Sequence, residues 1–165
     1  MGNPVVPQAG NPFMYYVTKT YGHELGLSAC FRQWKAESHC HFLHGYPLSF
    51  KFTFGAEVLD KNNWVIDFGG LKEIKAFLVD KFDHKLLIAR DDPKLEQLMD
   101  LVGEGLADPT IIPAVGCEGF AKYVFTYVDE WLHFTDHSPR VMLCQVEVRE
   151  HGGNSAIYTG EPNYD

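Results

Sequence analysis

Alternation of apolar and polar side chains is clearest in residues 48–58. Four apolar side chains occupy every second position there, namely Leu48, Phe50, Phe52 and Phe54. A period of two places them on one face of a strand, which is typical of a sheet with one buried side. Strands are also predicted at 14–31, 64–68 and 140–150, with β-branched and aromatic residues as the main signal.

Other segments have the spacing of helices. After Gly69-Gly70, apolar residues recur at intervals of three and four, at Leu71, Ile74, Phe77, Leu78 and Phe82. A second amphipathic helix is predicted at 118–132 and a short helix at 93–102, whereas the wider stretch 88–114 has no evident role. Helices between paired strands predict an α+β fold in which two helices cover one face of an antiparallel sheet. The open edges of such a sheet need partners, and edge-to-edge assembly into a barrel is one solution.

Composition and charge narrow the classes of function. Residues 1–13 are rich in Pro, Gly and Asn, so we expect a flexible N-terminal arm before a single domain at 14–165. The net charge of -8 argues against nucleic acid or membrane as the partner, because both need a basic patch, but it allows a small anionic substrate. The sequence has no secretory signal, no membrane-spanning apolar stretch and no disulfide-type spacing of its 4 cysteines. A cytoplasmic protein with free thiols is therefore predicted.

A cluster of metal-binding residue types lies in residues 38–46. It contains three histidines and one cysteine, at His39, Cys40, His41 and His44. These are zinc-ligating side chains, but a polar loop that is merely rich in histidine has the same composition. Cys40 is open to two interpretations as well, because most free cysteines are small core residues, whereas flanking histidines favour a thiolate.

Two further positions carry possible acid–base or binding chemistry. Asp83 precedes His84 at the end of the first predicted helix, where a carboxylate can orient an imidazole for proton transfer. The alternative is that His84 simply interacts with the helix C-terminus. Glu150 continues the apolar face of the last strand, so it is either a buried receptor for a guanidine-like edge or a solvated strand end.

Taken in order, these segments resemble the family of 6-pyruvoyl-tetrahydropterin synthase and 6-carboxy-tetrahydropterin synthase. The matching segments are 27–31 (LSACF), 40–46 (CHFLHGY), 64–72 (WVIDFGGLK), 82–84 (FDH), 116–118 (GCE) and 146–150 (VEVRE). The resemblance implies the tunnelling fold, in which subunits assemble into barrels as trimers or hexamers with active sites between subunits. It also implies a small-molecule pterin substrate.

The resemblance assigns a role to each matching side chain. Cys40 would be a catalytic acid or base, and Asp83 with His84 would form the dyad that relays the proton on the opposite side of the substrate. Glu150 would anchor the pterin, with Glu118 as a second substrate-binding residue. The implied enzyme is a lyase that converts 7,8-dihydroneopterin triphosphate, or a close analogue, to 6-carboxy- or 6-pyruvoyl-tetrahydropterin. The alternative is a homologue that binds a pterin without turning it over, or that takes an altered substrate.

The zinc site of the family is altered in this sequence. The resemblance implies three histidine ligands, but Phe31 and Tyr46 occupy two of the positions and only His44 remains. Either His39 and His41 join His44 in a rebuilt site, or the protein orients its substrate without the metal. Zinc is therefore possible but doubtful. Other polar side chains near this loop that could orient a substrate are Tyr46, Arg32 and Lys35.

Overall fold

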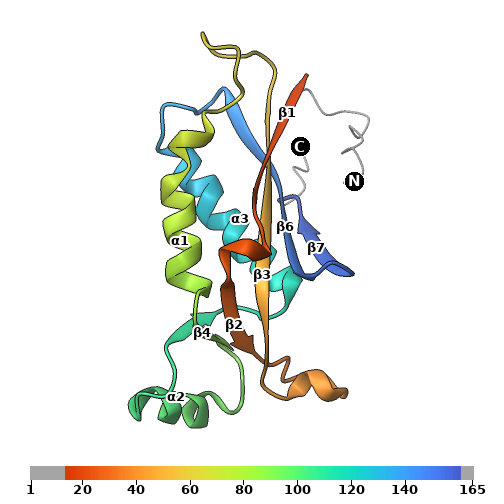
Figure 1. Ribbon diagram of the computed structural model, residues 1–165, viewed down its shortest axis with the longest axis vertical. Helices are drawn as coiled ribbons and strands as arrows, with labels where there is room; N and C mark the ends of the chain where they lie inside the picture. The colour runs from red at the N-terminus through yellow and green to blue at the C-terminus, as the bar shows by residue number, and fades with distance from the viewer. Residues whose placement is uncertain (1–13, 161–165) are drawn as a thin grey trace.

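The computed structural model describes residues 14–160, and the predicted arm at 1–13 lies outside this range. The described chain forms seven strands and three α-helices (Figure 1). The strands are β1 (Tyr15–Tyr21), β2 (Leu27–Phe31), β3 (His44–Ala56), β4 (Lys85–Ala89), β5 (Pro109–Ile112), β6 (Val141–His151) and β7 (Asn154–Tyr158). The α-helices are α1 (Lys72–Phe82), α2 (Leu95–Gly103) and α3 (Cys117–His133). Short 3-10 turns occur at His23–Leu25, His39–His41 and Phe68–Gly70.

The long strand β3 organises the sheet. Its first part pairs with β2, with Leu27 opposite Leu48, and its second part pairs with β1 on the same edge and with β6 on the other. The full order is β5-β4-β2-β3-β6-β7, with β1 added to β3. The β2–β4 and β4–β5 pairs are parallel, so the sheet is mixed rather than antiparallel throughout as predicted. The strand predicted at 14–31 is two strands, because a 3-10 turn that ends at Gly26 (φ 69°) interrupts it.

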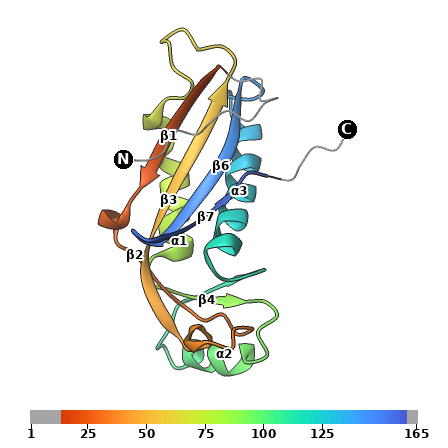
Figure 2. The same cartoon turned by 90° about the vertical axis from the view of Figure 1, so that its right-hand side faces the viewer.

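The core lies between the sheet and the helices, as the α+β prediction expects. Figure 2 shows α1 and α3 on the same side of β1, β3 and β6. The predicted apolar face of β3 is completely buried, with Phe50, Phe52 and Phe54 all at 0% exposure. From α3, the ring of Phe120 packs edge-on against Phe31, with 5.0 Å between ring centroids. The alternation read from the sequence therefore identified the core face of the sheet.

The segment after β3 departs from the prediction. Residues 64–68 form no strand but a loop, in which the successive side chains of Val65 and Ile66 are both buried. The carboxylate of Asp60 holds this loop by accepting the backbone N–H groups of Asn62 (2.8 Å) and Trp64 (2.9 Å). These two hydrogen bonds satisfy backbone N–H groups that would otherwise need a partner on a neighbouring strand.

The stretch 88–114 contains a small structural unit of its own. It consists of the end of β4, then α2, then β5, and α2 is the short helix predicted near 93–102. Leu86, Ile88 and Leu98 form a second apolar cluster there. Residues 14–160 thus contain the three predicted helices, of which α1 and α3 are the two that cover the sheet. No helix within residues 14–160 has the length and apolar character needed to cross a membrane.

Candidate active site

A pocket of about 590 Å³ brings together residues that are far apart in the sequence. Cys40 comes from a 3-10 turn, His44 from the start of β3, Glu118 from the first turn of α3, and Glu150 from the end of β6. All four were predicted as site residues. The rest of the lining is Phe31, Gln33, Ala36, Ser38, Gly116, Cys117, Gly153, Asn154 and Ser155. We call this the Cys40 pocket.

The loop that carries Cys40 is fixed by its own backbone. The side chain of Ser38 accepts the N–H of Cys40 at 3.4 Å and so caps the 3-10 turn. At the base of the loop, the N–H of Gln33 donates to the carbonyl of Cys40 at 2.9 Å. The amide side chain of Gln33 also donates to the carbonyl of Val115 at 3.3 Å, just before α3. The loop is thereby tied to the element that supplies Glu118.

An ion pair with the turn that follows β4 holds the same loop from outside the pocket. Arg32 donates to both carboxylate oxygens of Asp92 at 2.8 Å each, and also to the carbonyl of His41 at 3.2 Å. The Asp92 side chain is 1% exposed, and these hydrogen bonds hold its pKa below the usual range. Lys35 pairs with Asp91 at 3.0 Å. The stretch 88–114 thus positions the Cys40 loop, and Arg32 and Lys35 serve as structural cations outside the pocket lining.

The start of α3 places a second thiol beside the predicted anchor. Cys117 and Glu150 line the same pocket, and the negative charge of Glu150 acts on the Cys117 thiol. Burial, followed by the charges of Glu150 and Glu118, raises the pKa of Cys117 to about 12. The thiol therefore stays protonated at neutral pH and can donate to the Glu150 carboxylate. In the sequence, the position of Cys117 directly before Glu118 is the signal that points to its place in this pocket.

The predicted dyad forms but lies elsewhere on the surface. Nδ1 of His84 is 2.7 Å from a carboxylate oxygen of Asp83, while the His84 side chain is 85% exposed. His84 has φ of 56°, a costly conformation for a residue other than glycine, and its N–H donates to the carbonyl of Ser28 at 2.7 Å. Neither residue lines the Cys40 pocket. One copy of the chain therefore holds the two halves of the predicted proton-transfer system apart.

Aromatic rings occupy the position implied for zinc. Phe31, His44 and Tyr46 contact one another, with ring centroids 5.0 Å (Phe31–His44), 5.6 Å (His44–Tyr46) and 6.3 Å (Phe31–Tyr46) apart. Nδ1 of His44 donates to the carbonyl of Phe42 at 2.7 Å, which leaves Nε2 with its lone pair. One imidazole, one phenol and one phenyl ring do not fit a three-histidine zinc site.

The neighbouring histidines do not rebuild such a site in this conformation. Nδ1 of His41 is bonded to the carbonyl of Ser38 at 2.5 Å, and its ring packs on Phe42. Within residues 14–160, no three His, Cys, Asp or Glu side chains are grouped so as to hold a metal ion. The structure thus does not gather His39, His41 and His44 into one ligand set.

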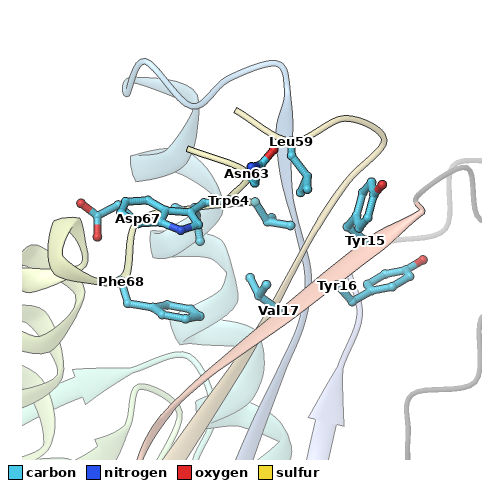
Figure 3. Close-up of a pocket in the computed structure, with 10 residues that line it drawn as sticks. Tyr15, Tyr16, Val17, Leu59, Asn63, Trp64, Asp67 and Phe68 are labelled. Carbon is cyan, nitrogen blue, oxygen red and sulfur yellow. The ribbon is translucent and has the colours of Figure 1, made fainter. Parts of the chain in front are cut away.

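A second pocket lies at the other end of the sheet and contains none of the predicted site residues. It measures about 450 Å³ and adjoins β1 and the loop before α1. Figure 3 shows the side chains of Trp64, Phe68 and Val17 converging on it, while the carboxylate of Asp67 points away. Its lining is mainly aromatic and aliphatic, so it offers few groups for acid–base chemistry.

Comparison with known proteins agrees with the order of the site segments. The sequence profile of the family described as 6-pyruvoyl tetrahydropterin synthase matches residues 22–161. The chain belongs to this family. A 6-carboxy-5,6,7,8-tetrahydropterin synthase from Aquifex aeolicus is 27% identical over 139 residues, which cover 82% of this chain and 85% of the relative. A protein of the same name from Rickettsia felis is 34% identical over 65 residues, or 39% of this chain and 47% of the relative.

Solved structures show that the fold is the one found in this family. An uncharacterized protein from Wolinella succinogenes matches with a TM-score of 0.73 and 18% identity, covering 89% of this chain and 98% of that one. The 6-pyruvoyl tetrahydropterin synthase of Plasmodium falciparum matches with a TM-score of 0.64 and 16% identity, covering 87% and 96%. Despite low identity, almost the whole of each neighbour is superimposable on this chain, which confirms the predicted tunnelling fold.

Proposed function

We propose that this member of the family is a pterin side-chain lyase. Its substrate is 7,8-dihydroneopterin triphosphate or a close analogue, and its product is 6-carboxy- or 6-pyruvoyl-tetrahydropterin. The observation that supports this most directly is the Cys40 pocket, which joins a thiol to the carboxylates of Glu118 and Glu150. A small-molecule substrate, a homo-oligomer (trimer or hexamer) and a cytoplasmic location accompany the proposal.

Binding rests on Glu150 in this proposal. Its carboxylate accepts two parallel N–H groups from the guanidine-like edge of the pterin, namely the 2-amino group and N3–H. The protonated thiol of Cys117 lines the same pocket and is a donor available to this carboxylate. Glu118 lines the same pocket and provides a second acceptor for the bound ring.

Proton transfer rests on Cys40 and on the dyad of a neighbouring copy. Cys40 moves a proton on one side of the substrate side chain. His84 acts from the other side, with Asp83 bonded to Nδ1 so that Nε2 exchanges the proton. In the reaction that yields the 6-pyruvoyl product, the bond between carbon and the triphosphate oxygen breaks, and tautomerisation moves protons between side chain and ring.

We further propose that the chain works without a metal at Phe31, His44 and Tyr46. The mutual packing of the three rings supports this, since only His44 offers a nitrogen ligand. Metal analysis of the native protein should give much less than one zinc per chain. An equimolar zinc content would instead mean that His39, His41 and His44 rearrange into a ligand set.

Turnover and binding together test the function. Purified protein incubated with dihydroneopterin triphosphate should release triphosphate and form a new pterin. Cys40→Ala should abolish turnover and keep pterin affinity, whereas Glu150→Gln should lose affinity by about tenfold or more, as expected for a charge-assisted hydrogen bond. Lys61→Met, on an exposed turn, serves as the matched surface control. Pterin binding that depends on Glu150 with no turnover would instead favour the homologue that binds without catalysis.

A further inference from the structure

A cluster of lysines surrounds a hollow of about 420 Å³ between β1 and the start of α1. Lys19 comes from β1, and Lys72 and Lys75 lie within the first four residues of α1. Figure 1 shows β1 running beside α1 in this part of the molecule. Glu24 is the acidic side chain that residues 14–160 contribute to the lining, and its carboxylate accepts the N–H of Gly22 at 3.3 Å. We call this the lysine hollow.

The positive charge of the lysine hollow is not compensated. Among the described residues 14–160, Lys19, Lys72 and Lys75 form no ion pair, whereas Lys81 and Lys85 each pair with an aspartate. Lys19 instead lies over the ring of Tyr21, 5.3 Å from its centroid.

Local structure adds to the cost of this arrangement. Cations at the start of a helix oppose the helix dipole. The acidic residue in that turn, Glu73, is directed away and accepts the indole N–H of Trp131 at 2.6 Å. In a chain with net charge -8, an anionic ligand that carries several charges would account for such a group.

The Cys40 pocket has the opposite character. Of the described residues, Glu118 and Glu150 line it, and no lysine or arginine does. The proposed substrate carries a triphosphate, whose negative charges would lie close to these carboxylates if the pocket had to hold the whole molecule. Because like charges repel at short distance, cations from outside the pocket must accompany the triphosphate.

The two features lie beside the two free edges of the antiparallel part of the sheet. Within residues 14–160, Lys19 belongs to β1, which pairs with β3 alone, and Asn154 and Ser155 of the Cys40 pocket belong to β7, which pairs with β6 alone. Lys19 and Tyr158 stand on one cross-strand row, through the pairs Lys19–Phe52, Phe52–Val146 and Val146–Tyr158. Pairing of β1 of one copy with β7 of another would bring the lysine hollow of the first to the edge that carries Asn154 and Ser155 of the second.

We propose that Lys19, Lys72 and Lys75 bind the triphosphate group of the substrate held in the Cys40 pocket of the adjacent copy. The assignment of the substrate rests on the proposed function, whereas the hollow and its charge do not. The triphosphate group of the substrate and a free polyphosphate have the same chemistry, so inorganic tripolyphosphate is the simplest probe.

Calorimetry at low salt measures the subsite directly. Wild-type protein should bind tripolyphosphate, and Lys72→Met/Lys75→Met should bind it about 10- to 100-fold more weakly, as expected for charge-assisted contacts. Lys61→Met removes one exposed positive charge elsewhere and should leave the affinity within about twofold. No binding by the wild type, or an equal loss in the control, would overturn the proposal.

Binding of one pterin with a triphosphate and one without it distinguishes a substrate subsite from a site for free polyphosphate. The lysine substitutions should weaken binding of dihydroneopterin triphosphate and leave that of dihydroneopterin unchanged. Equal affinity of the wild type for both pterins would show that the hollow takes free polyphosphate only and would contradict the proposal. If the lysine dependence appears without any turnover, the proposed catalytic function fails and the subsite stands.

Mixed oligomers test the contribution from the adjacent copy. Glu150→Gln protein and Lys72→Met/Lys75→Met protein should each be nearly inactive. In a one-to-one mixture that is dissociated and reassembled, about one quarter of the sites combine an intact pocket with an intact neighbouring hollow, so activity should return to about that level. A mixture no more active than its components, with active wild type treated in parallel, would refute the assignment between copies.

Discussion

Replacing Asp92 by Asn should loosen the loop that carries Cys40. Asp92 is almost completely buried and receives two hydrogen bonds from Arg32, and its Oδ1 also accepts the N–H of Lys94 at 2.8 Å. Removing one member of a fully buried ion pair costs about 3–5 kcal/mol. Because the Arg32 side chain is 19% exposed and partly hydrated, we expect about 2–3 kcal/mol here. At constant protomer concentration this lowers Tm by about 4–12 °C.

The pH dependence of this loss has a definite sign. Arg32 holds the pKa of Asp92 below that of an unfolded aspartate, which is about 3.9. The stabilisation is therefore fully present above the unfolded pKa and is lost as the pH falls through the folded one. The difference in unfolding free energy between wild type and Asp92→Asn should be constant from neutral pH to about pH 5 and then shrink as the solution becomes more acidic.

Urea denaturation at several pH values measures this difference, and the exposed pair on the same loop supplies the control. Lys35→Met removes the partner of Asp91, but both side chains are more than half exposed, so its cost should stay below about 1 kcal/mol. Turnover by Asp92→Asn should also fall more than pterin affinity, because Cys40 sits on the loop and Glu150 does not. An Asp92→Asn protein as stable as Lys35→Met would refute this reasoning.

Three further outcomes follow from the core and the site. Phe120→Ala should destabilise by about 3–5 kcal/mol in urea denaturation, since Phe120 is fully buried against Phe31 and Phe82, and a loss below about 1 kcal/mol would contradict this packing. Cys117, with its pKa raised to about 12, should resist iodoacetamide at pH 8 until the protein unfolds, and rapid native labelling seen by mass spectrometry would disagree. Phe31→His/Tyr46→His should raise the zinc content toward one per chain, and an unchanged metal content would argue against these positions as ligand sites.

Local patterns in the sequence were sufficient for the main elements of the core. Alternation in β3 and helical spacing in α1 and α3 arise from burial of a single face, which neighbouring residues report by themselves. The strand predicted at 64–68 was wrong because a local pattern does not report contacts with distant residues. Its apolar residues look like a strand, but Arg140 donates to the carbonyls of Val58, Trp64 and Val65 and fixes the segment as a loop, and Arg140 lies more than 70 residues away.

The candidate site was predictable only in part. The ordered motifs placed Cys40, Glu118 and Glu150 in one site, and the structure does bring them together. The proximity of Cys117 to Glu150 and the ion pair between Arg32 and Asp92 could not be foreseen. Both depend on which strands become neighbours, and the parallel pairing of β2 with β4 is what places Arg32 and Asp92 close to each other.

Several costly features of a single copy find one explanation in assembly. Among residues 14–160, the strands β1 and β7 each pair with one neighbour, and an edge strand favours addition of another strand. His84 adopts a strained conformation and presents its imidazole to solvent beside Asp83, and the lysine hollow concentrates positive charge at the edge of β1. In the proposed assembly, a second copy would bring a pocket lined by two glutamates to this surface, and that single arrangement would give each of these features a role.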